Sequence, residues 1–130
     1  MASDISIIIT VYNRPDEIEE LLKSLVDQSD HDFDVIVVDD GSEKKSDLVV
    51  EKFRNKLTIQ YFFKTNTGPG DSRNYGCNKS KADFFIFFDS DCIIPEDYFK
   101  LLRAHVDKLD AYGGPDKAHP GFTPVQKAIS

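Results

Sequence analysis

The chain has 130 residues, of which 40% are hydrophobic and 30% are charged, and its formal net charge is -7. This composition is typical of a folded globular domain and excludes a largely disordered chain. The acidic balance, without any basic run, argues against DNA or RNA as a partner, because nucleic-acid binding needs clustered lysine and arginine. Neither a signal peptide nor an apolar run near the ~20 residues of a membrane-spanning helix is recognisable, so we expect a cytoplasmic protein.

Strand-like and helix-like patterns alternate along the chain. The nearly continuous apolar run at residues 5–11 is typical of a strand buried on both faces of a parallel sheet. A helix is predicted from Pro15 to about Val26, and acidic residues after Pro15, among them Glu17, complement its positive end. The later elements are predicted as strands at 35–38, 57–63 and 84–88, and as helices at 46–54, at 71–81 and from Pro95 onward. Helical spacing predicts these core-facing side chains: Leu48, Val49, Phe53, Tyr98, Phe99, Leu101, Leu102 and Val106.

This alternation predicts right-handed β-α-β units, and therefore a Rossmann-like, doubly wound, mainly parallel α/β sheet with helices on both faces. Ligands of such sheets bind beyond the carboxyl ends of the strands. A polar cluster follows each predicted strand, and we expect the four clusters to share one crevice. The clusters are Tyr12-Asn13-Arg14, Asp39-Asp40, Lys64 with Asn66 and Gly68, and Asp89-Ser90-Asp91.

The character of the sequence changes after Leu109. Tyr112 to Pro124 contains three of the six prolines and three of the seven glycines. We therefore expect one α/β domain at residues 1–110 and a region of different character at 111–130, which is a linker, a loop at a binding site or a tail ordered only against other sequence. Val125 to Ser130 is interpreted as the first turn of a helix that is cut short, so the chain is expected to be truncated.

The triplet Asp89-Ser90-Asp91 places two carboxylates one residue apart at the end of a buried strand. Such a pair suits a hard divalent cation, completed by diphosphate oxygens and water. The alternative is a turn or a helix N-cap, because aspartate and serine favour both. The segment Asp39-Asp40-Gly41-Ser42 has a similar alternative. A carboxylate at this strand end accepts the imide N–H of a pyrimidine base or binds ribose hydroxyls, or the segment is only a loop that leads to a helix.

The stretch from Asn66 to Gly76 is interpreted as a phosphate-binding loop and helix start. Gly68 and Gly70 allow the backbone to approach a ligand closely, and the helix start offers backbone N–H groups. Arg73 and Arg14 are candidates to neutralise phosphate, although an exposed arginine is often only solvated surface. No Ser-His-Asp order, nucleophile elbow or Walker A pattern is present, so covalent catalysis has no support.

Taken together, the four clusters resemble the motifs of family 2 glycosyltransferases with the GT-A fold. The resemblance covers residues 4–116, and the motifs stand in the same order and at the same spacing. It rests on Ile7 to Arg14, Val35 to Ser42, Asn66-Thr67-Gly68 with Ser72 to Gly76, and Phe87 to Asp91.

The resemblance implies a nucleotide diphosphate-sugar donor, with UDP as the expected nucleotide and Mg²⁺ or Mn²⁺ on the diphosphate. It places Asp40 against the uracil ring and Arg73 near the nucleotide. It also makes Asp91 a metal ligand, while Asp89 faces the ribose or the sugar and is a second candidate ligand. The other residues assigned to the donor nucleotide are Thr10, Val11, Tyr12, Arg14, Gly68 and Ser90.

Inverting transfer needs a base for the acceptor hydroxyl and stabilisation of the departing diphosphate. No acidic motif follows Asp91 at the distance typical of the family's base, and Asp116 is not assigned to that role, so we expect the base beyond residue 130. We therefore expect these residues to bind donor but to transfer sugar poorly. The resemblance makes residues 1–110 the donor-binding domain and residues 111–130 the start of the acceptor-side region. It also implies a sugar or lipid-linked acceptor, and association with the cytoplasmic face of a membrane through other sequence.

Three alternatives stay open at this point. A receiver-like phosphoacceptor domain has similar size and an acidic pair, although that pair should follow the first strand. A sugar nucleotidyltransferase also joins a nucleotide, a metal and a sugar phosphate. A binding module that has lost catalysis would carry the same donor-site residues.

Overall fold

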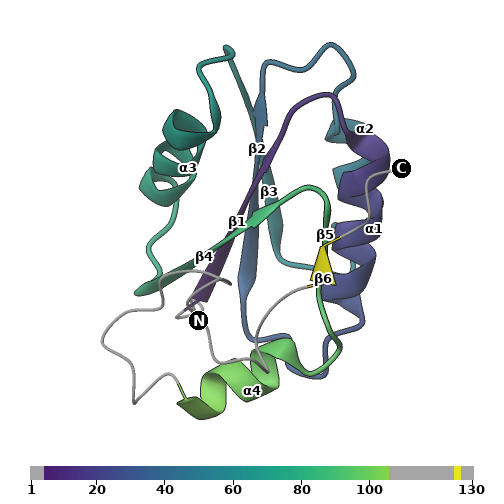
Figure 1. Ribbon diagram of the computed structural model, residues 1–130, viewed down its shortest axis with the longest axis vertical. Coiled ribbons are helices and arrows are strands. Elements are labelled where there is room, and N and C mark those ends of the chain that lie inside the picture. Colours follow the sequence, from purple (N-terminus) through teal and green to yellow (C-terminus); the bar gives the residue numbers. More distant parts are fainter. Residues whose placement is uncertain (1–4, 106–124, 127–130) are drawn as a thin grey trace.

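The structure is a computed structural model that describes residues 5–105 and 125–126. Its centre is a four-stranded parallel sheet in the order β3-β2-β1-β4 (Figure 1). The strands of this sheet are β1 (Ile5–Val11), β2 (Asp34–Asp40), β3 (Ile59–Lys64) and β4 (Phe84–Asp89). The helices are α1 (Pro15–Val26), α2 (Asp47–Glu51), α3 (Pro69–Asn78) and α4 (Tyr98–His105). Two short strands, β5 (Cys92–Ile93) and β6 (Val125–Gln126), pair in antiparallel fashion.

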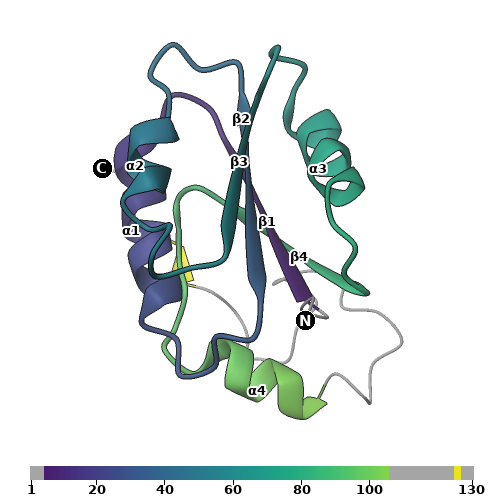
Figure 2. The same cartoon turned by 180° about the vertical axis from the view of Figure 1, so that it is seen from behind.

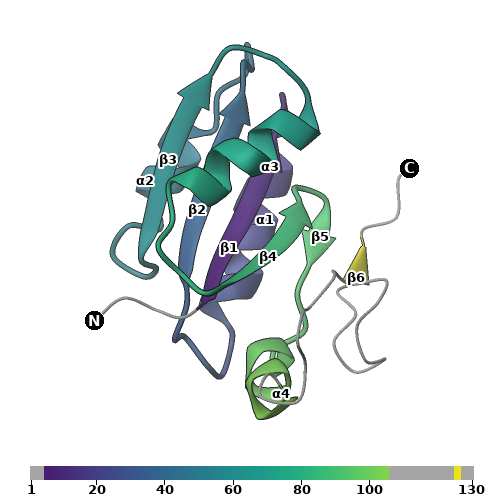
Figure 3. The same ribbon diagram turned by 90° about the vertical axis from the view of Figure 1, so that its left-hand side faces the viewer.

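The helices cover both faces of the sheet. Helices α1 and α2 lie on one face and α3 lies on the other, as the two opposite views show (Figures 1 and 2). The view in Figure 3 has α3 in front of the sheet and α1 and α2 behind it. This arrangement confirms the predicted doubly wound α/β fold, and it explains why the strands are apolar on both faces.

Alternate residues of the strands form two apolar clusters, one on each face. Ile7 and Ile9 belong to the larger cluster, which includes the buried residues of α1 and α4. Ile8 points to the opposite face and packs in the smaller cluster beneath α3. At this face a Cβ added to Gly76 would lie 2.6 Å from Ile8 Cγ2, so glycine is what allows α3 to approach the sheet.

Two side chains predicted to face the core do not do so. Leu48 is 75% exposed and Leu101 is 42% exposed. Helix α2 has only five residues, of which only Val50 is buried, so the longer helix predicted at 46–54 is wrong. Leu48 is two positions before Val50, about 200° around the helix, and therefore points away from the core. Phe53, Tyr98, Phe99 and Leu102 are buried as predicted, Val49 is partly buried, and residue 106 lies outside the described residues.

The segment after β4 differs from prediction in three ways. Strand β5 is not apparent in the sequence pattern, and residues 125–126 form strand β6 rather than helix. These two strands pair across more than thirty intervening residues, which no local pattern reveals. Helix α4 begins at Tyr98, because Pro95 lies in the preceding turn and accepts the Tyr98 N–H through its carbonyl oxygen at 3.1 Å.

The bounds of the predicted domain and of helix α3 differ in how far the structure describes them. The boundary expected near residue 110 lies outside the described residues. Helix α3 starts two residues earlier than predicted, at Pro69, and ends at Asn78. Among the helices described, none combines the length and the apolar character that crossing a membrane requires.

Candidate functional site

A pocket opens at the carboxyl ends of β1 and β4, where the order in which strands are added to the sheet reverses. Ligands of open α/β sheets bind at such switch points. The pocket has a volume of about 460 Å³, which suits a small-molecule ligand. Its lining residues are Thr10, Val11, Tyr12, Arg14, Glu17, Asp40, Pro69, Asp89, Ser90 and Asp91.

All of the predicted site residues except Gly68 and Arg73 line this pocket. Gly68 is the N-cap of α3, with a φ of 101°, and Arg73 lies one turn further along that helix. The structure adds Glu17 and Pro69, which the sequence analysis did not assign to the site. The signal for Glu17 was its place in the first turn of a helix that follows a strand end, but a helix-dipole role explained it equally well.

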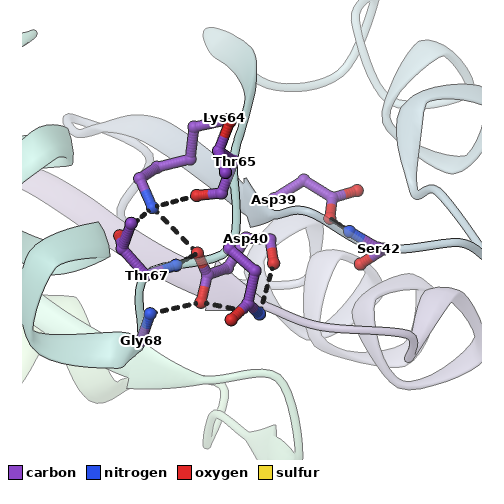
Figure 4. A network of polar contacts seen from close by, with 8 residues as sticks. Asp39, Asp40, Ser42, Lys64, Thr65, Thr67 and Gly68 are labelled. Atoms are coloured by element: carbon purple, nitrogen blue, oxygen red, sulfur yellow. Dashed lines mark hydrogen bonds and ion pairs between the residues drawn. The ribbon is translucent and has the colours of Figure 1, made fainter.

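Asp40, at the end of β2, holds the loop that follows β3 (Figure 4). Its Oδ1 accepts hydrogen bonds from Lys64 Nζ at 2.8 Å and from the Thr67 N–H at 2.9 Å. Its Oδ2 accepts from the Gly68 N–H at 3.0 Å and from the Asn66 side-chain amide at 3.4 Å. One carboxylate therefore fixes the backbone that leads into α3.

Burial by itself would raise the pKa of Asp40. The hydrogen bonds from Lys64, Thr67 and Gly68, together with the charge of Lys64, outweigh it and lower the pKa below its ordinary value. The side chains of Asp40 and Lys64 are only 8% and 13% exposed, so this ion pair is shielded from solvent. The Asp40 carboxylate consequently carries its charge throughout the neutral range.

Asp39 has no exposed surface and serves a different loop. Its Oδ1 accepts from the Ser42 N–H at 3.2 Å, and its Oδ2 accepts from the Ser46 N–H at 3.2 Å and from the Tyr61 hydroxyl at 2.5 Å. Burial, followed by the hydrogen bond to Asp39, raises the pKa of Tyr61, so this phenol remains a neutral donor. Asp39 thus shapes the loop after β2 and does not line the pocket.

The loop after β2 (residues 41–46) and the loop after β3 (residues 65–68), together called the loop pair, also contact each other. Gly41 has a φ of 76°, and a Cβ added there would lie 2.7 Å from the Asn66 backbone nitrogen. Asn13, whose φ is 55°, donates its N–H to Ser42 Oγ at 2.7 Å and accepts the Glu43 N–H at 2.8 Å. Only a glycine fits without strain at Gly41, whereas asparagine tolerates the left-handed region at Asn13.

The opposite wall of the pocket is formed by Asp89, Ser90 and Asp91, called here the acidic triplet. Asp89 has a side chain that is 60% exposed, and Arg73 Nη2 donates to its Oδ1 at 3.5 Å. Ser90 Oγ donates to Glu17 Oε1 at 3.0 Å. The Oδ1 atom of Asp91 is buried, so the two carboxylates of the triplet differ in their exposure to solvent.

The acidic triplet offers oxygen ligands to a divalent cation. Carboxylate oxygens from Asp89 and Asp91 are hard ligands of the kind that Mg²⁺ and Mn²⁺ prefer. Within residues 5–105 and 125–126, no group of three or more His, Cys, Asp or Glu side chains is arranged to hold a metal. The site therefore fits a cation bound through one or two carboxylates and completed by a phosphate ligand and water, and does not fit an all-protein cage.

Solved structures of other proteins share the fold of this chain. The chain is similar to residues 1–349 of TarS from Staphylococcus aureus, with 38% identity and a TM-score of 0.76 over 83% of this chain and 33% of that one. The same protein has been solved with UDP and with UDP-GlcNAc. A mannosyltransferase from Pyrobaculum calidifontis, solved with GDP-Man and Mn²⁺, has a TM-score of 0.67 over 78% of this chain and 33% of that one, and at 21% identity it shows a shared fold alone.

Sequence comparisons agree with the structural ones. An uncharacterized glycosyltransferase from Haemophilus influenzae is 40% identical over 100 residues, which are 76% of this chain and 33% of the relative. The poly(ribitol-phosphate) beta-N-acetylglucosaminyltransferase TarS of S. aureus is 38% identical over 107 residues, which are 79% of this chain and 19% of TarS. The chain thus spans a third or less of the length of these curated relatives. Residues 6–128 match the profile of glycosyl transferase family 2, and with the fold described above this chain belongs to that family and has its GT-A architecture.

Proposed function

We propose that this chain binds the nucleotide part of a nucleotide diphosphate-sugar, with UDP as the nucleotide, for transfer of the sugar to an acceptor hydroxyl with inversion. The observation that carries the proposal is one pocket with a buried, charged Asp40 on one side and the acidic triplet on the other. Family membership argues against the receiver-like and nucleotidyltransferase alternatives.

On the Asp40 side, the proposed ligand is the base. Thr10, Val11 and Tyr12 lie at the end of β1 along the pocket, and Tyr12 is 52% exposed, which leaves its ring accessible to a planar base. Asp40 is the proposed acceptor for the imide N–H of uracil, a role that needs the charged carboxylate that its lowered pKa provides. The imide N–H would replace the long bond that the Asn66 amide donates to Oδ2 at 3.4 Å, because the carboxylate already accepts four hydrogen bonds. Guanine presents a different pattern of donors and acceptors, so this side of the pocket would distinguish the two nucleotides.

On the triplet side, the proposed ligand is the diphosphate with its cation. Asp91 and Asp89 would hold Mg²⁺ or Mn²⁺, and the bound cation would supply Lewis-acid stabilisation of the diphosphate leaving group. Arg14 lines the pocket with a side chain that is 62% exposed, and Arg73 lies beside Asp89, so both guanidinium groups are placed to neutralise phosphate charge. Gly68 lies at the N-terminus of α3 and has no side chain, so the backbone there can approach the diphosphate closely.

The general base for the acceptor is proposed to lie outside the described residues. The described carboxylates that line the pocket are Glu17, Asp40, Asp89 and Asp91, and each has a donor-side contact or role assigned above. We therefore expect these 130 residues to bind donor and to transfer sugar poorly to a sugar or lipid-linked acceptor. Robust transfer by this chain would overturn that part of the proposal.

Calorimetric titration of UDP and GDP in the presence of Mn²⁺ tests the nucleotide assignment. UDP is expected to bind more tightly than GDP, and Asp40→Asn is expected to remove most of that preference, because an amide can present an N–H where the carboxylate only accepts. Asp83→Ala, an exposed carboxylate away from the pocket, serves as the matched control. Tighter binding of GDP, or an unchanged preference in Asp40→Asn, would contradict the assignment.

A further inference from the structure

Helix α1 carries a polar stripe on an otherwise apolar side. Glu17, Ser24 and Gln28, called the α1 stripe, are separated by seven and four residues, so they lie on one side of the helix and of the residues that directly continue it. Helix α1 contacts β5, and the chain from β4 through β5 passes alongside it (Figure 1). The stripe therefore faces the segment that follows the acidic triplet.

The far end of the α1 stripe holds residues 94–99. Ser24 Oγ accepts the Ile94 N–H at 3.1 Å. Gln28 is 4% exposed, its side-chain amide donates to the Pro95 carbonyl at 2.6 Å, and its Oε1 accepts the Phe99 N–H at 3.3 Å. These bonds fix the chain immediately after β5 to α1, independently of any side chain in the pocket.

The pocket end of the α1 stripe holds the acidic triplet itself. Glu17 Oε1 accepts the Ser90 hydroxyl at 3.0 Å and lies 3.9 Å from Arg14 Nε. The Glu17 side chain is 24% exposed, so its contact with Ser90 is largely shielded from water. Ser90 is the residue between the two carboxylates, and its anchoring constrains the backbone on which both of them stand.

We propose that Glu17 is a positioning residue for the proposed cation and diphosphate site, acting through its hydrogen bond to Ser90. The inference rests on the proposed function, and it assigns to Glu17 a role distinct from binding the nucleotide. Ser24 and Gln28 hold the chain that follows β5. The Glu17–Ser90 bond holds the acidic triplet, which precedes β5, so the segment is anchored on both sides of that strand. Residues that orient metal ligands in this way typically change metal affinity by about 10- to 100-fold when they are removed.

The hydrogen bond, rather than the charge of Glu17, is the feature that matters in this account. A glutamine at this position keeps an oxygen that can accept the Ser90 hydroxyl, whereas an alanine does not. Removal of Ser90 Oγ breaks the same bond from its other side. The two deletions should therefore have equal effects that do not add.

The test is calorimetric titration of UDP, with and without saturating Mn²⁺, into wild type, Glu17→Ala, Glu17→Gln, Ser90→Ala and the double variant Glu17→Ala/Ser90→Ala. Glu19→Ala is the control on the same helix, because Glu19 pairs with Lys23 and Lys52 away from the pocket. We expect Glu17→Ala and Ser90→Ala each to weaken Mn²⁺-dependent binding about tenfold, and the double variant no further. Glu17→Gln should stay close to wild type, and metal-free binding of UDP should be unchanged in both Glu17 single variants, because Glu17 is not assigned to the nucleotide.

Three results would overturn the inference while leaving the proposed function in place. The first is Mn²⁺-dependent binding by Glu17→Ala that equals wild type. The second is a loss in Glu17→Gln as large as in Glu17→Ala, which would assign the effect to charge. The third is an equal loss with and without Mn²⁺, which would make Glu17 a residue of the general fold. Failure of the wild type to bind UDP with Mn²⁺ would instead overturn the proposed function and this inference with it.

Discussion

The two walls of the pocket are built in different ways. The Asp40 carboxylate and the loop pair are joined by a dense set of hydrogen bonds within the chain, and Asp40 is 5% exposed. On the triplet wall, the Asp89 side chain is 60% exposed and its ion pair with Arg73 is long, at 3.5 Å. A wall that is fixed before binding suits recognition of a rigid base, whereas exposed charges suit a cation and a diphosphate that bring their own counter-charges.

Because of this difference, we expect mutations in the two walls to affect different properties, stability in one and ligand binding in the other. Substitutions in the loop pair or its supports should change the free energy of unfolding first, because they remove buried hydrogen bonds. Substitutions in the triplet wall should change ligand binding with little change in stability, because exposed ion pairs stabilise proteins weakly.

The largest expected effect on stability is that of Asp39→Ala. It leaves the Tyr61 hydroxyl and the N–H groups of Ser42 and Ser46 without their buried acceptor, so the free energy of unfolding should fall by about 3 kcal/mol. Urea unfolding followed by circular dichroism measures it. Asp83→Ala, at an exposed position, should change stability by less than about 0.5 kcal/mol, and equal effects of the two variants would break the comparison.

A second variant, Gly41→Ala, tests the contact within the loop pair. Its Cβ would meet the Asn66 backbone at 2.7 Å at a φ of 76°, and we expect a loss of about 2 kcal/mol. Gly70→Ala is the matched control, because a Cβ there meets nothing within 4 Å and Gly70 is not among the glycines of positive φ. Thermal unfolding of both variants decides the point, and a Gly41→Ala protein as stable as Gly70→Ala would contradict it.

A smaller effect is expected from Lys64→Met, and its sign depends on pH. The Asp40 pKa is lowered in the folded protein, so its interactions stabilise the fold above its unfolded pKa of about 3.9 and that contribution is lost as pH falls through the folded pKa. Without Lys64 the pKa is lowered less, so the variant should be about 1 to 2 kcal/mol less stable at pH 7 and should lose less stability on acidification. Urea unfolding at pH 7 and at pH 3 measures both; equal acid losses would refute the role of Lys64.

The smallest effect on stability is expected on the triplet wall. Arg73→Gln removes an exposed pair and should change the free energy of unfolding by less than about 0.5 kcal/mol. The same change should weaken Mn²⁺-dependent UDP binding about tenfold, because it removes a charge-assisted partner for phosphate. Arg54→Gln, which removes an arginine remote from the pocket, should leave UDP binding unchanged. A large loss of stability without loss of binding would reverse the comparison.

The sequence predicted the fold, because the buried strands and the helical spacing are strong local patterns. The run at residues 5–11 became β1 with the same bounds, and the polar clusters stand at the strand ends, but Lys64, Asn66 and Gly68 do not line the pocket with the other three clusters. Asp39 and Asp40 are adjacent, so their side chains point to opposite faces of the sheet. Which loop each carboxylate binds was not predictable, because the hydrogen-bond donors come from segments that are distant in the sequence. The contact of Glu17 with Ser90 was missed for a similar reason: the two residues are 73 positions apart, and only the packing of α1 against β5 joins them.

The central claim is that the acidic triplet holds a divalent cation for the diphosphate of a nucleotide donor. Calorimetric titration of UDP into wild type and Asp91→Ala, each with and without Mn²⁺, tests it most directly, with Asp83→Ala as the control. We expect Mn²⁺ to tighten UDP binding to wild type and to the control by about tenfold or more, and Asp91→Ala to lose this gain while keeping its metal-free affinity. An equal gain from Mn²⁺ in Asp91→Ala and in wild type would contradict the claim.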